Sequence, residues 1–235
     1  MSVSHRILVP VEVLEGEDVP EALFAALAPV PVVVLGYHVL PEQTPPGQAR
    51  LQFEDRAQKR LSGIADLARA AGCEAETRLV FTHEEEQTVR RVAAEADCDT
   101  ILVPNPTTSV ESVLVSLRGG DDPELIGEVV AAFAADDDFP ITLLHVAREG
   151  ETAERRWRAQ EQLVAGGVDA DRIDTTSVTA DAPVSIIAEV AADHDLVVMG
   201  ETAPSFREYV FGEDHQRVAD RSLGPVLVVG AVGER

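Results

Sequence analysis

Short apolar runs alternate with longer amphipathic stretches along the whole chain. Runs such as RILVPVE (residues 6–12) and PITLLHVA (140–147) are rich in β-branched residues, as in strands buried on both faces of a sheet. The stretches between them, such as residues 48–71, have helical periodicity. Strands that alternate with helices predict a parallel sheet covered by helices on both faces. The pattern therefore indicates an α/β fold.

The same order of elements occurs twice. The first copy has expected strands at 6–12, 31–40 and 74–81 and a fourth that ends at Pro104, and the second has expected strands at 112–118, 140–147, 172–179 and 195–200. Each second strand carries a His-Val pair near its end, with His38 and His145 as the histidines. Each first helix is preceded by an Asp-x-Pro-Glu or Asp-Pro-Glu signal, in which Asp is suited to cap the helix and Pro to its first turn. Two β-α-β-α-β-α-β repeats are expected.

The two copies differ after the fourth strand. Only residues 105–111 separate the first copy from the second, whereas residues 201–235 follow the second copy. This tail has room for a loop, a helix at about residues 213–222 and a fifth strand, PVLVVGAV, at 225–232. We therefore expect a truncated domain at residues 1–108 and a complete domain at 109–235.

The apolar runs ILVPV, LLHV, DLVVMG and PVLVV, in this order and spacing, resemble the universal stress protein family in a tandem, haloarchaeal-like form. The resemblance covers essentially the whole chain, and it is stronger in the second repeat than in the first. It implies two Rossmann-like repeats, each a doubly wound parallel sheet of strand order 3-2-1-4-5, the first without its last helix and fifth strand. Many members of the family bind ATP where strands 1 and 4 meet, a topological switch point of the sheet.

The family's nucleotide motif places Asp-Gly after strand 1 and Gly-x-x-Gly-(x9)-Gly-Ser/Thr after strand 4. Carried onto the second repeat, the motif and the strand ends beside it give the candidate binding residues Leu117, Arg118, Gly119, Val146, Met199, Gly200, Ala203, Gly212 and Glu213.

This chain departs from the motif at four points. Arg118 stands at the Asp position, Ala203 replaces the second glycine, the spacing before Gly212 is one residue short, and Glu213 replaces the hydroxyl residue. The helix dipole favours a carboxylate at a helix start, so Glu213 is expected to occupy the place where a phosphate would bind. Arg118 would then pair with Glu213 or meet a different anionic ligand.

The first repeat departs further, because Glu12 takes the Asp position without a following glycine and the phosphate loop is absent. We expect this copy to have a structural role, completing a pseudo-dimer with the second.

The leading functional interpretation is a non-catalytic regulatory or protective binding module of the stress response, with a degenerate nucleotide pocket and no established cofactor. The sequence contains no Walker loop, nucleophile elbow or zinc-protease motif, so we expect no enzyme. One alternative is an ATP- or AMP-binding switch that uses the second repeat. A third interpretation, a weak nucleotide hydrolase, would need His215 as its base.

Charge narrows the range of partners. The chain has 42 acidic and 19 basic residues, a net charge of −23 and a single lysine, Lys59. Such a surface disfavours nucleic acid and anionic membranes as partners. The acidic residues are scattered, which favours adaptation to a salt-rich cytoplasm over an acidic interaction tail. No apolar run is long enough to span a membrane, and we expect no signal peptide.

Several smaller features admit two interpretations. The apolar 225–232 strand would be an exposed edge, so we expect it to pair with the first repeat or with a second chain in a homodimer. The Arg155, Arg156 and Arg158 cluster beside Trp157 is interpreted as a solvated amphipathic helix, with a docking face as the alternative. Cys73 and Cys98 are expected to be buried and inert, and no metal site is expected.

Overall fold

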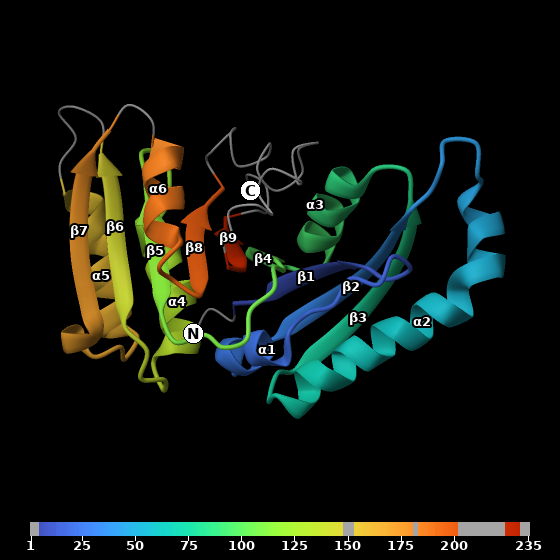
Figure 1. The fold of residues 1–235 in the computed structure, drawn as a ribbon, viewed down its shortest axis with the longest axis horizontal. Coiled ribbons are helices and arrows are strands. Elements are labelled where there is room, and N and C mark those ends of the chain that lie inside the picture. Colours follow the sequence, from blue (N-terminus) through green and yellow to red (C-terminus); the bar gives the residue numbers. More distant parts are fainter. Residues whose placement is uncertain (1–4, 148–152, 181–182, 202–223, 231–235) are drawn as a thin grey trace. The chain divides into compact units, whose positions relative to one another are not determined.

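The computed structural model describes residues 5–147, 153–180, 183–201 and 224–230. Contacts divide the chain into two compact units, Met1–Pro104 and Asn105–Gly230. Each unit alternates strands and helices along the chain (Figure 1). The domain boundary between residues 108 and 109 stays a prediction.

The first unit is a parallel sheet of order β3-β2-β1-β4. Its elements, in chain order, are β1 (Ile7–Glu12), α1 (Glu21–Leu27), β2 (Val32–Val39), α2 (Pro46–Ala70), β3 (Ala75–Thr82), α3 (Glu85–Glu95) and β4 (Thr100–Val103). In repeat numbering this is the order 3-2-1-4, as expected from the resemblance. The described part of this unit ends at its fourth strand, without the last helix and fifth strand.

The second unit is a parallel sheet of order β7-β6-β5-β8-β9, which corresponds to 3-2-1-4-5. Its elements are β5 (Val113–Leu117), α4 (Pro123–Ala134), β6 (Ile141–Ala147), α5 (Glu154–Ala165), the short 3-10 helix η1 (Ala170–Arg172), β7 (Ile173–Thr179), α6 (Pro183–Ala191), β8 (Leu196–Gly200) and β9 (Val226–Val229). The doubly wound α/β fold is confirmed in both units. The helix expected at 213–222 lies outside the described residues.

Burial along the strands follows their place in the sheet. Every residue of the central strands β5 and β8 is buried, whereas the edge strand β3 has one buried residue, Phe81, and the edge strand β7 is mostly exposed. Central strands of a parallel sheet are covered on both faces and therefore need continuous apolar runs. The apolar and polar pattern in the sequence thus reflects which strands lie inside each sheet.

An aspartate before the fourth strand of each unit fastens that strand to the start of the first. In the first unit, Asp99 lies 2.6 Å from the Nδ1 atom of buried His5. In the second unit, the Oδ2 atom of Asp195 accepts hydrogen bonds from Ser112 Oγ, at 2.9 Å, and from the backbone N–H of Glu111, at 3.0 Å. The two copies therefore use the same carboxylate position with different donors.

The two helix-start signals have different outcomes. Asp122 caps α4, because its Oδ1 atom accepts the backbone N–H groups of Glu124 and Leu125. Asp18 does not cap α1; the N-cap is Pro20, and the Asp18 carboxylate pairs with Arg60 of α2. The capping expectation for α1 was wrong, since Pro20 lies between Asp18 and the first helical residue and a tertiary ion pair takes the carboxylate.

Candidate functional site

The candidate site lies at the carboxyl ends of β5 and β8 in the second unit. These central strands lie side by side (Figure 1). They pair in parallel, with Ser116 opposite Met199. The chain leaves β5 toward β6 on one side, while β8 lies on the other, so the strand order reverses here. In an open α/β sheet, ligands bind at such a switch point, beyond the carboxyl ends of the strands.

A tight turn closes the end of β5. The backbone N–H of Asp121 donates to the carbonyl of Arg118, at 3.2 Å, and the Asp121 carboxylate in return accepts the backbone N–H of Arg118, at 2.8 Å. Asp121 is only 4% exposed. A hydrogen bond to an ionised acceptor is stronger than a neutral one, so this reciprocal pair holds the turn and fixes the carboxylate.

The Asp121 side chain lies directly against Gly200, the last residue of β8. A Cβ atom on Gly200 would lie 2.9 Å from the Cβ atom of Asp121 and closer still to its carboxylate group. Gly200 is therefore required by packing within the unit. The resemblance assigns this glycine to the close approach of a phosphate, yet in this structure a carboxylate takes the space beside it.

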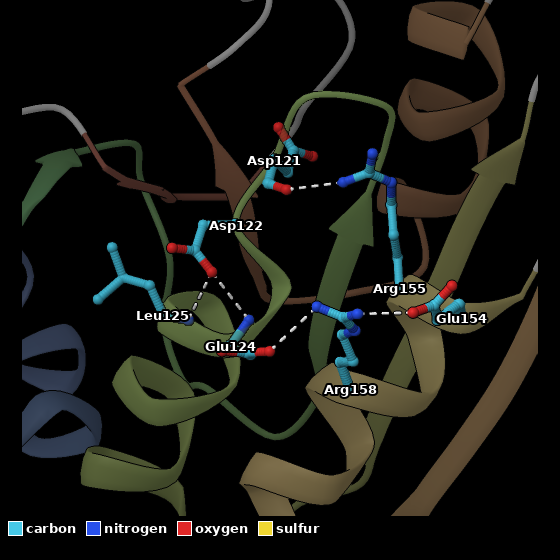
Figure 2. Close-up of polar contacts among 7 residues, drawn as sticks. All are labelled: Asp121, Asp122, Glu124, Leu125, Glu154, Arg155 and Arg158. Atoms are coloured by element: carbon cyan, nitrogen blue, oxygen red, sulfur yellow. Dashed lines mark hydrogen bonds and ion pairs between the residues drawn. The ribbon is translucent and has the colours of Figure 1, made fainter. Parts of the chain in front are cut away.

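Helix α5 supports the turn from the side, as Figure 2 shows. Arg155 Nη1 donates to the backbone carbonyl of Asp121 at 3.0 Å. Arg158 bonds to Glu124 of α4, at 3.3 Å, and to Glu154 within its own helix, at 2.6 Å. The dashed contacts join the first turns of α4 and α5 to the loop that carries Asp121. The position of Asp121 is thus set by both helices.

Close packing of α4 against α5 brings Arg155 to this turn. A Cβ atom at Gly127 would lie 2.7 Å from the backbone oxygen of Ala159, so only glycine allows the two helices this approach. Gly127 is buried in α4, and Ala159 is fully buried in α5. A residue far from the switch point therefore contributes to its geometry.

The arginine cluster of α5 makes contacts inside the unit. Arg155 and Arg158 bond as described above, and Arg156 Nη1 donates to Ser177 Oγ of β7 at 3.2 Å. Trp157, between them, is 64% exposed. Through these contacts, Arg155 connects α5 to the Asp121 turn, Arg158 connects it to α4, and Arg156 connects it to β7.

Arg118 is the unusual residue of the site. Its side chain is buried, with 8% exposure for the residue, and its Nε and Nη2 atoms are shielded from solvent. Neither nitrogen has a hydrogen-bond partner among the residues that the structure describes. Buried polar groups are nearly always paired, so this guanidinium needs a separate explanation.

The other candidate residues lie where the strand ends meet or fall outside the described ranges. Leu117, Val146 and Met199 are buried at the ends of β5, β6 and β8, and Gly119 is exposed in the turn. Ala203, Gly212 and Glu213 lie outside the described residues, as does His215. The described residues thus bring together Leu117, Arg118, Gly119, Met199 and Gly200 at one edge of the sheet.

Sequence reasoning missed Asp121 as a site residue. The Asp121-Asp122 pair was interpreted as a helix signal, although one aspartate is enough to cap a helix. The signal that would have found it is the presence of an aspartate, Asp121, beyond the one that the cap needs. Its contact with Gly200 joins residues far apart in the chain and is therefore invisible to local patterns.

In the first unit, the position equivalent to Arg118 holds a carboxylate instead of a guanidinium. Glu12, the last residue of β1, is buried and accepts hydrogen bonds from the backbone N–H groups of Leu14 and Val39. His38 Nδ1 lies 2.9 Å from its Oε1 atom. The Glu12 carboxylate is thus bound by donors of its own unit, which gives His38 a structural role.

A second glutamate adds negative charge to this end of the first unit. The Glu17 carboxylate accepts the backbone N–H of Glu12 at 2.6 Å. Burial, followed by repulsion from Glu85, Glu12 and Glu15, raises the pKa of Glu17 above its ordinary value. Burial likewise raises the pKa of Tyr37, whose hydroxyl donates to Glu85 at 2.6 Å. These carboxylates would repel an added anion at this end of the first unit.

Two further properties concern residues 5–147, 153–180, 183–201 and 224–230. No group of three or more histidine, cysteine, aspartate or glutamate side chains in these ranges is arranged to hold a metal ion. None of the helices in them has the length and apolar character needed to cross a membrane.

Comparison with known proteins gives matches among solved structures. No protein-family model matches the chain, and no curated protein matches it. A universal stress protein from Archaeoglobus fulgidus DSM 4304 is similar over 96% of each chain, with a TM-score of 0.61 and 14% identity. A universal stress protein in complex with cAMP covers 53% of this chain and 99% of its own, with a TM-score of 0.38 and 22% identity. The chain therefore has the fold of a universal stress protein.

Proposed function

We propose that this chain is a universal stress protein that acts as a non-catalytic regulatory or protective binding module in a salt-rich cytoplasm. In this proposal the second repeat does not bind ATP in the manner that the family resemblance implies. The observation that carries the proposal is the buried carboxylate of Asp121, which lies against Gly200 at the switch point.

Electrostatics disfavours a triphosphate at this position. At an effective dielectric constant of about 20, two like unit charges about 4 Å apart cost on the order of 4 kcal/mol. A cost of this size lowers affinity by about a thousandfold. The Asp121 carboxylate would impose this cost on any phosphate that approached the backbone at Gly200.

The absence of catalysis is inferred from how the site's polar groups are used. Asp121 accepts the backbone N–H of Arg118, and Arg155 donates to the backbone carbonyl of Asp121. Both side chains are committed to holding the turn, and a guanidinium such as that of Arg118 stays protonated and does not act as a base. These contacts support a binding site more than a reaction centre.

Calorimetry in molar KCl tests the proposal with ATP as the titrant. The unaltered protein is expected to show no saturable ATP binding below millimolar concentration. Asp121→Asn keeps an oxygen to accept the Arg118 N–H but removes the charge, so ATP binding should improve, as it should in Glu213→Ser. Asp122→Asn removes the same charge one residue away and should change nothing, since asparagine also caps helices. Micromolar ATP binding by the unaltered protein would refute the proposal.

A second candidate function is an ATP- or AMP-binding switch that uses the second repeat. The specific observation in its favour is the buried guanidinium of Arg118, which has two nitrogens without partners among the described residues. A nucleotide phosphate would supply acceptors for them. Titration with AMP, which carries one phosphate, separates this function from the first. Micromolar AMP binding that is lost in Arg118→Met would favour the switch.

A further inference from the structure

The guanidinium of Arg118 is a cation without a described counterion. Arginine stays protonated in proteins, so its burial cannot be relieved by loss of a proton. The nearest carboxylate along the chain, Asp121, accepts the backbone N–H of Arg118 and lies against Gly200. Removing a charge from water is costly unless a partner of opposite sign compensates. The site therefore calls for an anion.

The arrangement of the two nitrogens defines the kind of anion. In a planar guanidinium, Nε and Nη2 lie on one edge, and their N–H groups point the same way as a fork. Such a fork fits two oxygens of a single carboxylate or phosphate group. Both nitrogens of this edge lack a partner in the described structure and are shielded from solvent, so the hydrogen-bonding capacity of the whole edge is unsatisfied. Exposed Gly119 and Gly120 follow Arg118, so the turn that carries it borders solvent.

The charge balance of the site limits the anion further. Arg118 contributes one positive charge, and the buried Asp121 carboxylate lies in the same turn. A singly charged anion on Arg118 would compensate the guanidinium and leave the Asp121 charge as the one remaining charge of the turn. A phosphate dianion or a polyphosphate would leave excess negative charge near Asp121, with the penalty that argues against ATP.

We infer that the Nε–Nη2 edge of Arg118 binds a singly charged oxyanion of a small molecule, either a carboxylate or a phosphate diester. This inference rests on the proposed function, because it identifies the ligand class of a binding module that rejects ATP. The two sources share one chemistry, two oxygens that carry a single negative charge, and the experiment separates them.

The experiment follows the Arg118 Nε–H signal by NMR in full-length protein labelled with ¹⁵N-arginine, in KCl solution. The signal is assigned by its loss in Arg118→Lys. The titrants are acetate, dimethyl phosphate, sulfate and ATP. Acetate or dimethyl phosphate should shift the signal downfield and saturate, and whichever binds more tightly identifies the source. Sulfate and ATP should bind at least about tenfold more weakly than the better monoanion, a difference of about 1.4 kcal/mol.

Variants separate recognition by the fork from attraction by charge alone. Arg118→Lys keeps the charge but loses the fork. The monoanion concentration needed for a given rise in melting temperature should therefore increase at least about tenfold. Arg118→Met should abolish this rise. Arg91→Lys makes the same change at an exposed arginine of α3 and should leave it intact.

Three results would overturn the inference. The first is a signal that shifts without saturating, which would indicate only screening by salt. The second is tighter binding of sulfate or ATP than of either monoanion. The third is a signal that responds only in Glu213→Gln, which would make Glu213 the counterion of Arg118. The calorimetric ATP test is separate, so the ligand class can fail while the proposed function stands.

Discussion

At the scale of single residues, burial decides which titratable groups are available for chemistry. The Cys73 thiol donates to the Phe24 carbonyl at 3.2 Å, and burial raises its pKa to about 11. Burial raises the pKa of Cys98 to about 12. Both thiols stay protonated near neutral pH, where the thiolate is the reactive form. Their expected burial is confirmed.

Glu17 gives a prediction about pH. Because burial raises the folded-state pKa of Glu17, the folded protein binds this proton more tightly than the unfolded chain. The contribution of Glu17 to the free energy of unfolding should therefore fall as pH rises from about 4.5, the ordinary value, through the raised pKa. Glu17→Gln keeps an oxygen that can accept the Glu12 N–H and carries no charge. It should be at least as stable as the unaltered protein at pH 7 and lose its advantage in acid.

Urea unfolding at several pH values measures this difference. Glu42→Gln, at an exposed position, serves as the control and should leave the pH dependence unchanged. An advantage of Glu17→Gln that grows as pH falls would contradict the assigned pKa direction.

At the scale of elements, much of the fold could be predicted from the sequence, because strand burial and helix periodicity are local patterns. The apolar runs at β5 and β8 and the cap at Asp122 needed only neighbouring residues. The contact of Asp121 with Gly200 could not be predicted in this way, since it depends on the turn after β5 meeting the end of β8 in three dimensions. The motif did single out Arg118, but burial of its nitrogens became evident only from the packing.

The cap of α4 gives a prediction about stability. Asp122→Ala removes an acceptor for two backbone N–H groups, at 3.1 and 3.2 Å, and should lower the free energy of unfolding by about 1 kcal/mol. Asp122→Asn should recover most of the loss, because asparagine caps well. Urea denaturation measures both variants, and equal stability of the alanine variant and the unaltered protein would contradict the cap.

Strand β9 gives a prediction about stability and assembly. Val228 lies opposite Met199 of β8 and is buried, so Val228→Lys would place a charge in an apolar layer and should lower the melting temperature. We also propose that residues 225–232 pair with the first repeat or with a second chain, the latter giving a homodimer. Light scattering over a range of concentrations tests the dimer. Unchanged melting and scattering in the variant would count against both expectations.

At the scale of the whole molecule, the dominant property is negative charge. A net charge of −23 on 235 residues repels itself and opposes compaction. At 1 M salt the Debye length is about 3 Å, so most of this repulsion is screened. The scattered distribution of acidic residues makes the effect a property of the chain as a whole.

The salt prediction follows directly. The thermal unfolding midpoint should rise markedly between low and molar KCl. Scanning calorimetry at fixed pH measures the rise, and sodium chloride serves as a control for a specific effect of potassium. A midpoint that stays flat across this range would refute the interpretation as adaptation to a salt-rich cell.

The Glu12 carboxylate of the first unit competes with free anions for the same backbone N–H donors, and it does so while attached to the chain. A group attached to the chain acts at an effective concentration that reaches the millimolar range even for flexible tethers. Glu12 is held against its donors at the end of β1, and it accepts two backbone N–H groups there. A free anion would have to displace the Glu12 carboxylate, which is covalently part of the chain and cannot dissociate. Changes in the cell's pool of small anions should therefore leave the first repeat unaffected, whatever they do at the second.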